Sequence, residues 1–138
     1  MQQQVTRAMD ISNAAIAQEI GHAANAFEQR RTGHRPKSVT VVLGNETLVV
    51  TLYGALSPAE VALVKSPAGA ARMQEFHRQL FATSSEPLCG EIKRITGVEV
   101  RQATTEIETA TGTVVQVFLL ADSVTAGTWS GSGRDGQA

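Results

Sequence analysis

The sequence predicts an α+β fold of two αββ units, with the helices packed on one face of a four-stranded, mainly antiparallel sheet. Two observations indicate this fold. Each half of the chain has an apolar pattern with helical spacing that ends at a Thr-Gly pair, Thr32-Gly33 in the first half and Thr96-Gly97 in the second. Each pair is followed by two stretches of alternating β-branched residues, as in half-buried strands. The order of the strands in the sheet stays open.

The composition is that of one ordinary globular domain. The 138 residues are 42% hydrophobic and 18% charged, and the formal net charge is -1. This charge disfavours binding to nucleic acid or anionic membranes by bulk attraction. The single cysteine, Cys89, excludes an intrachain disulfide and fits a reducing compartment. Because there is neither a stretch of about 20 apolar residues nor a signal-peptide core near the start, we expect a cytoplasmic protein without a transmembrane segment.

The first element is expected to be a helix that follows a frayed N-terminus, residues 1–9. Asp10 or Ser12 supplies a side-chain oxygen that can cap the start of the helix. Basic residues near position 30 favour the negative end of the helix dipole, and Gly33 is the expected glycine after the last turn. The apolar stripe of this helix consists of Ile16, Ile20, Ala23, Ala24 and Phe27.

From Ser38 the apolar period changes to two, which predicts a β-hairpin. Gly44-Asn45 offers the positive φ that a tight turn requires. The first strand runs up to this turn, and the return strand covers about Glu46 to Tyr53. The alternating apolar residues are Val39, Val41 and Leu43 in the first strand and Leu48, Val50 and Leu52 in the second.

The middle of the chain predicts a short helix followed by longer helical segments. Ser57, Pro58 and Glu60 fit a capping box with proline in the first turn, and this helix is expected to end near Lys65. A longer helix begins at Pro67 with an apolar stripe of Met73, Phe76, Leu80 and Phe81. Pro87 either kinks this helix or lies in the first turn of a separate one. The apolar face then continues through Leu88, Ile92 and Ile95 to the helix stop at Gly97.

The last predicted elements are a second strand pair and a disordered tail. Val98, Val100 and Gln102 alternate in one strand, and Val115, Val117 and Leu119 alternate in the closing strand after a turn at 109–112. Residues 122–138 contain mostly Gly, Ser, Thr and Ala, with a lone Trp129, and bury too little apolar surface to offset their ordering entropy. The predicted domain is therefore residues 10–121.

The sequence shows no recognisable catalytic or metal-binding grouping. His22, His34 and His77 fall on different elements without metal-ligand spacing, and neither a nucleophile elbow nor a phosphate-binding glycine loop occurs. The capping box accounts for Glu60 without a catalytic role. We therefore expect no catalytic residue, no metal and no cofactor, and we expect that the protein is not an enzyme.

The densest polar segment is basic, with five basic residues within eight positions: Arg30, Arg31, His34, Arg35 and Lys37. One interpretation is a contact site for an anion or an acidic partner, on a loop that Pro36 stiffens. The other is a cationic helix end that runs into a solvated loop. Both interpretations stay open, while the few aromatic residues disfavour RNA binding.

Several motifs, taken in order, resemble those of a known family. They are a Gly-basic-x-Pro loop (33–36), a Leu-Ser-Pro-Ala-Glu helix start (56–60) and an Ile-Lys-Arg-Ile-Thr-Gly-Val helix stop (92–98). Together they resemble the MpsC family, long described as a domain of unknown function and now named for a Na+-translocating, membrane-potential-generating system. The resemblance covers about residues 12–121.

The resemblance implies an accessory or regulatory protein linked to a cation- or bicarbonate-coupled membrane transport complex, and a place peripheral to the inner face of the membrane. Our first functional hypothesis is therefore a non-enzymatic binding module. The alternative is a small-molecule or anion sensor that binds its ligand at the basic loop and at the helix start of Ser57. Because an open sheet has unprotected edges and an uncovered face, we also expect a homodimer.

Overall fold

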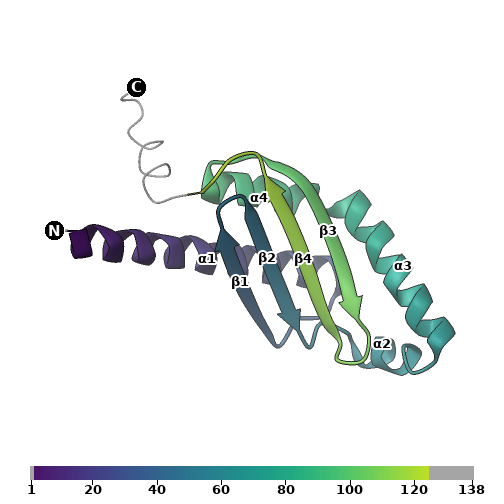
Figure 1. The fold of residues 1–138 in the computed structure, drawn as a ribbon. Coiled ribbons are helices and arrows are strands. Elements are labelled where there is room, and N and C mark those ends of the chain that lie inside the picture. Colours follow the sequence, from purple (N-terminus) through teal and green to yellow (C-terminus); the bar gives the residue numbers. More distant parts are fainter. Residues whose placement is uncertain (1, 125–138) are drawn as a thin grey trace.

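The computed structural model describes residues 2–124, and it describes the side chains from residue 14 onward. Figure 1 shows one sheet with the helices on one of its faces. The fold class predicted from the sequence is therefore confirmed. The elements are α1 (Gln2–Thr32), β1 (Ser38–Gly44), β2 (Thr47–Tyr53), α2 (Pro58–Leu63), α3 (Pro67–Ser84), α4 (Glu86–Thr96), β3 (Val100–Glu108) and β4 (Thr113–Leu120).

The strand order of the sheet is β1-β2-β4-β3, and all neighbouring strands are antiparallel. The hairpins β1-β2 and β3-β4 therefore lie side by side and meet at β2 and β4, with β1 and β3 as the two edges. A row across the centre of the sheet runs from Val41 through Val50 and Gln116 to Thr105. The side chains of this row share one face, because directly paired residues of neighbouring strands point to the same side.

The helices cover this face and bury a continuous apolar core. α1 packs against β1 and against α4, while α3 packs against β3. Three rings connect the layers: Phe27 of α1 makes an edge-to-face contact with Phe81 of α3 at 6.4 Å between centroids, and Phe81 contacts Phe118 of β4 at 6.1 Å. Such aromatic pairs contribute about 0.5–1.5 kcal/mol beyond their buried area.

The two Thr-Gly pairs end their helices in the same way. The Thr32 hydroxyl donates to the carbonyl of Glu28 at 2.8 Å and accepts from the backbone N–H of His34 at 3.1 Å. In the second half, the Thr96 hydroxyl donates to the carbonyl of Ile92 at 2.7 Å and accepts from the N–H of Val98 at 3.1 Å. The glycine that follows each threonine is left-handed, with φ of 79° at position 33 and 78° at position 97. This shared geometry supports the division of the chain into two αββ units.

The N-terminal part of α1 differs from the prediction. The helix begins at Gln2, so Asp10 and Ser12 lie inside it and the predicted helix start at either residue is wrong. Residues 2–9, which we expected to be frayed, belong to the same helix. The stripe in the described part is confirmed, since Ile16, Ile20, Ala24 and Phe27 are all in the core.

Three details of the second half also differ from, or add to, the prediction. Pro87 lies in the first turn of a separate helix, α4, rather than in a kink. β3 begins at Val100 rather than at Val98, and it extends through the Thr-rich stretch to Glu108. In β4 the buried side chains are those of Val114, Gln116, Phe118 and Leu120, so the predicted Val-Val-Leu set at 115, 117 and 119 lies on the opposite face.

The core reaches slightly beyond the predicted domain boundary at 121. Val124 is buried in the core, and its backbone N–H donates to the carbonyl of Asn45 at 3.2 Å. Trp129 and the rest of the expected tail lie outside the described residues. Within residues 2–124, no helix combines the length and the apolar character that crossing a bilayer requires.

Candidate functional site

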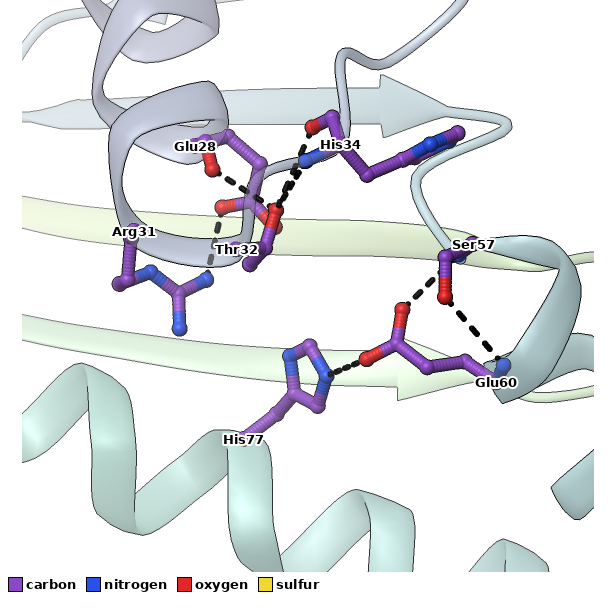
Figure 2. A network of polar contacts seen from close by, with 7 residues as sticks. All are labelled: Glu28, Arg31, Thr32, His34, Ser57, Glu60 and His77. Atoms are coloured by element: carbon purple, nitrogen blue, oxygen red, sulfur yellow. Dashed lines mark hydrogen bonds and ion pairs between the residues drawn. The ribbon is translucent and has the colours of Figure 1, made fainter.

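The five basic residues of the 30–37 segment do not form one exposed cluster. Arg30, Arg35 and Lys37 are exposed, but His34 is half-buried and the side chain of Arg31 is only 5% exposed. Arg31 forms an ion pair with the fully buried Glu28, with 2.7 Å between Nη2 and Oε1. Its guanidinium also lies over the ring of Phe27, 5.4 Å from the centroid. Figure 2 shows Arg31 and His34 pointing away from each other.

Two of the three exposed cations, Arg35 and Lys37, lie on the loop of residues 33–37, while Arg30 lies in the last turn of α1. The loop is fixed to the end of β2. The Nε2–H of His34 donates to the carbonyl of Gly54 at 3.0 Å, and the N–H of Lys37 donates to the carbonyl of Tyr53 at 2.8 Å. Pro36 is buried. The stem of Lys37 lies so close to Gly54 that a Cβ there would be 2.7 Å from its Cγ. We call Arg30, Arg35 and Lys37 the cationic loop. Arg35 and Lys37 project from the well-held loop backbone, and Arg30 projects from the end of α1 beside it.

A hollow of about 430 Å³ lies beside the cationic loop. It brings together two of the predicted elements, the basic segment and the start of α2. Its lining combines a cation and an imidazole with apolar walls and backbone: His34, Lys37, Gly54, Leu56, Pro58, Val61, Thr111 and Gly112. Ligand sites of soluble proteins commonly combine apolar walls with a few polar groups in this way.

The predicted capping box at the start of α2 is confirmed. The Ser57 Oγ accepts from the N–H of Glu60 at 3.3 Å, and Oε1 of Glu60 accepts from the N–H of Ser57 at 2.8 Å. Pro58 has no N–H to offer. Ser57, Glu60 and Val61 donate their N–H groups within this first turn. Because His34 already donates its Nε2–H to Gly54, an anion in the hollow would depend mainly on Lys37.

The second carboxylate oxygen of Glu60 has a partner that the sequence did not indicate. Oε2 accepts a hydrogen bond from Nε2 of His77 at 3.1 Å, as Figure 2 shows. His77 lies on α3 and is 1% exposed. The hydrogen bond from His77, helped by those from Ser57 and opposed by partial burial, lowers the pKa of Glu60 from 4.5 to about 2. Ser57, Glu60 and His77 thus form one connected unit that joins α2 to α3.

Further polar side chains are buried under α1 and α3. Among the described side chains, Oε2 of Glu28, Nε and Nη1 of Arg31, Nδ1 of His77, Oγ1 of Thr105 and both side-chain polar atoms of Gln116 have no hydrogen-bond partner. Figure 2 shows Arg31 and His77 pointing into the space between α1 and α3, over the sheet. We call Glu28, Arg31, His77, Thr105 and Gln116 the buried polar layer.

The position of the buried polar layer follows from the aromatic contacts. Arg31 comes four residues after Phe27, His77 comes four residues before Phe81, and Gln116 comes two residues before Phe118. Each step shifts the side chain by one helical turn or one strand repeat on the same face. The layer therefore lies next to the Phe27-Phe81-Phe118 contact, toward the end of the sheet that holds the cationic loop. Each unpaired buried polar group costs about 1–3 kcal/mol.

Helical spacing in the sequence indicates burial for part of this layer, but the charged and polar residue types at these positions favour exposure. Glu28 and Arg31 continue the α1 stripe four residues after Ala24 and Phe27, and His77 lies midway between Met73 and Phe81. The apolar stripe that the sequence predicts for α3 includes Phe76 instead, but Phe76 is 54% exposed. No local signal indicates the pairing of Glu60 with His77, which are 17 residues apart.

One further side chain with nucleophilic potential is the thiol of Cys89. Cys89 is half-buried, and desolvation raises the pKa of its thiol, which reduces the thiolate fraction at neutral pH. Among the described side chains of residues 14–124, no group of three or more His, Cys, Asp or Glu could hold a metal ion.

The comparisons with known proteins give a family and one distant relative. Residues 12–122 match the family described as "Na+-translocating membrane potential-generating system (MpsC)". The chain is 28% identical over 116 residues to the uncharacterized protein YbcI of Bacillus subtilis (strain 168), covering 84% of this chain and 94% of that protein. No solved structure matches. The match extends over nearly all of the described residues, from α1 to the end of β4, and on this basis the chain belongs to the MpsC family.

Proposed function

We propose that this protein is a non-enzymatic accessory module that docks onto an acidic surface of a membrane cation-transport complex through its cationic loop. The observation that carries the proposal is the display of Arg35 and Lys37 on a backbone held by His34 and Pro36. Arg30 adds a third exposed cation from the last turn of α1. Because the backbone that carries these cations is already fixed, the loop loses little conformational entropy on binding, and this favours docking. The family description, a Na+-translocating, membrane-potential-generating system, supports the choice of partner.

Charge distribution supports an acidic partner. The net charge of the chain is -1, so attraction to an acidic surface would depend on a local patch rather than on the whole molecule. The cationic loop is such a patch, because its three side chains are exposed and Lys37 lies at the rim of the hollow. Glu91 of α4 interacts with Arg30, so Arg35 and Lys37 carry most of the attraction to an acidic partner. A docking site of this kind is sensitive to salt, since exposed charges are screened over about 10 Å at 0.1 M ionic strength.

The non-enzymatic part of the proposal is supported by what the reactive groups do. Ser57 and Glu60 cap α2, and Glu60 is also tied to His77. A carboxylate whose pKa is about 2 is a weak base at neutral pH. The raised pKa of the Cys89 thiol makes that group a poor nucleophile as well.

The experiment is an affinity pull-down from gently solubilised native membranes, read by mass spectrometry. The wild type is compared with the double variant Arg35→Glu/Lys37→Glu. Arg72→Glu/Arg101→Glu is the matched control, because it reverses two exposed charges on α3 and β3 instead. We expect the wild type and the control to recover a membrane transport subunit and the loop variant to lose it. Equal recovery by all three proteins would contradict docking through the cationic loop.

Arg31 is left out of the loop variant for a structural reason. Its reversal would place a carboxylate beside the buried Glu28, so a loss of docking could result from a damaged core. Arg35 and Lys37 are exposed, and their reversal leaves the hydrogen bonds of His34 and of the Lys37 backbone in place.

A second candidate function is a sensor for a small anion, and the hollow of about 430 Å³ favours it. Lys37 would face the anion, while Leu56, Pro58 and Val61 would contact an apolar part of the ligand. A thermal-shift screen of phosphate, bicarbonate and nucleotides tests this candidate. Binding at a hundred times the dissociation constant stabilises by about 2.7 kcal/mol. The shift should disappear in Lys37→Gln but persist in Arg72→Gln, and a screen without any shift would contradict the sensor.

Two further expectations belong to the same proposal. Docking on a membrane complex from the cytoplasm would place the protein peripheral to the inner face of the membrane. Cell fractionation tests this location, because the loop variant should move from the membrane fraction to the supernatant. The second expectation is a homodimer that forms through one edge of the sheet.

A further inference from the structure

The two edges of the sheet differ in how well they are protected. β3 is interrupted by a register irregularity between Val100 and Gln102. It also carries the exposed charged residues Arg101, Glu106 and Glu108, and Arg78 of α3 bonds to Glu106 from the helix layer at 3.0 Å. Irregularities and charges of this kind prevent a sheet edge from pairing with another chain.

β1, the opposite edge, has none of these protections. Its sequence, Ser-Val-Thr-Val-Val-Leu-Gly, contains no charge and no proline. All seven residues pair with β2 in an uninterrupted register from Ser38 to Gly44. Val42 on the open face is 64% exposed. A regular, uncharged edge rich in β-branched residues is well suited to pairing with another strand.

The helix layer is also incomplete beside β1. A hollow of about 510 Å³ lies between α1 and β1, lined by Ala14, Ala17, Gln18, Gly21, His22, Val39 and Val41. Val39 and Val41 point to the covered face of the sheet but are only half-buried. Figure 1 shows that α1 passes over β1 and continues beyond this edge of the sheet. Apolar surface is therefore left uncovered on both layers at the same edge.

We propose that β1 pairs antiparallel with β1 of a second copy of this chain, which joins the two sheets into one across a two-fold axis. A second copy fits because identical strands related by a two-fold axis pair antiparallel, and an uncharged strand meets no like-charge repulsion from itself. A dimer that is stable in solution buries roughly 1,000 Å² of surface or more. The pairing of two seven-residue strands alone buries less than this. The part of α1 beyond the edge would supply the rest by covering the hollow of the second copy.

This inference does not rest on the docking proposal, because it concerns the mass of the isolated protein. Sedimentation velocity over a wide concentration range should give the wild type twice the 14.6 kDa mass of one chain. Val42→Lys places a charge from each copy near the two-fold axis and should weaken self-association at least tenfold. Thr104→Lys, the matched control on the protected β3 edge, is exposed as well and should leave the dimer unchanged. Circular dichroism checks that each variant is folded.

A second measurement locates the contact if Val42→Lys fails to fold. In a Cys89→Ser background, Thr40→Cys/Val42→Cys places thiols on the open face of β1, and Thr104→Cys places one on β3. Mild oxidation should link two chains through the β1 cysteines and not through the β3 cysteine. The proposal is overturned if the wild type has the mass of one chain at every concentration. It is overturned equally if the dimer survives Val42→Lys, or if only the β3 thiol forms the link.

Discussion

The Nε2 atom of His77 lies 3.1 Å from Oε2 of Glu60, and this hydrogen bond joins the middle of α3 to the first turn of α2. α2 contributes no buried residue to the core. Its position therefore depends on the capping box and on this contact, together with its packing against α3. Because Pro58 and Val61 of α2 form one wall of the 430 Å³ hollow, the contact also fixes the shape of the surface beside the cationic loop.

Glu60→Gln tests how much this contact stabilises the fold. The substitution keeps the shape of the side chain but removes the charge that the hydrogen bonds from Ser57 and His77 stabilise. We expect the free energy of unfolding to fall by about 1–2 kcal/mol, in the range for hydrogen bonds to charged groups. Urea denaturation measures this change. Glu75→Gln removes an exposed carboxylate of α3 as a control and should have a smaller effect. An equal effect of the two substitutions would contradict this role of Glu60.

The same carboxylate predicts a pH dependence of stability. The pKa of Glu60 is lowered from 4.5 to about 2 in the folded protein, so the folded state favours the ionised form. The stabilisation is complete above pH 4.5 and is lost as the pH falls from 4.5 toward 2, since the unfolded chain is protonated first. The difference in unfolding free energy between the wild type and Glu60→Gln should therefore be constant from pH 7 to 5 and shrink below pH 4.5. A difference that grows on acidification would contradict the lowered pKa.

Arg31 and Glu28 predict a strongly coupled pair of substitutions. Arg31→Met leaves the fully buried Glu28 without its cation and should destabilise the protein by about 3–5 kcal/mol. Adding Glu28→Leu to Arg31→Met should recover much of this loss, because the unpaired charge is then removed. A double-mutant cycle by chemical denaturation measures the coupling. Additive effects of the two substitutions would contradict a buried ion pair.

The two Thr-Gly helix stops predict unequal effects of the same substitution. Thr96→Val should cost about 1–3 kcal/mol, because it leaves the buried N–H of Val98 without a partner. Thr32 makes the same hydrogen bonds in a part-buried setting, where water can replace them, so Thr32→Val should cost less. Thr83→Val on the exposed face of α3 is the control. A larger loss at position 32 than at position 96 would contradict this explanation.

The elements that sequence reasoning predicted correctly have local causes. The hairpin turn was predicted at Gly44-Asn45 and lies one residue later, at Asn45-Glu46, with Gly44 as the last residue of β1. Asn45, with φ of 33°, supplies the positive φ that the turn requires. The capping box and the two helix stops depend on side chains within four residues of each other. Short-range hydrogen bonds of this kind form wherever the backbone allows them, and their residue patterns are therefore readable without the fold.

The parts that were not predicted depend on contacts between distant elements. β4 has apolar side chains on both faces, so its sequence does not show that Phe118 faces the helices and Val117 faces outward. Gln116 is buried because it lies between Val50 and Thr105, on strands distant in sequence. Arg30 and Arg31 look equivalent in the sequence, but only Arg31 extends the α1 stripe that begins at Ile16. The cationic loop could thus be predicted as basic but not as a group of three exposed side chains.

The most direct test of the account compares docking by the wild type, Arg35→Glu/Lys37→Glu and Arg72→Glu/Arg101→Glu on native membranes at about 50 mM and about 300 mM salt. Screening shortens the reach of exposed charges as salt rises. We predict that the wild type and the control bind at low salt and weaken together at high salt, while the loop variant binds weakly at both concentrations. Binding of the loop variant that equals the control at low salt would contradict the account, since the cationic loop would then not be the docking surface.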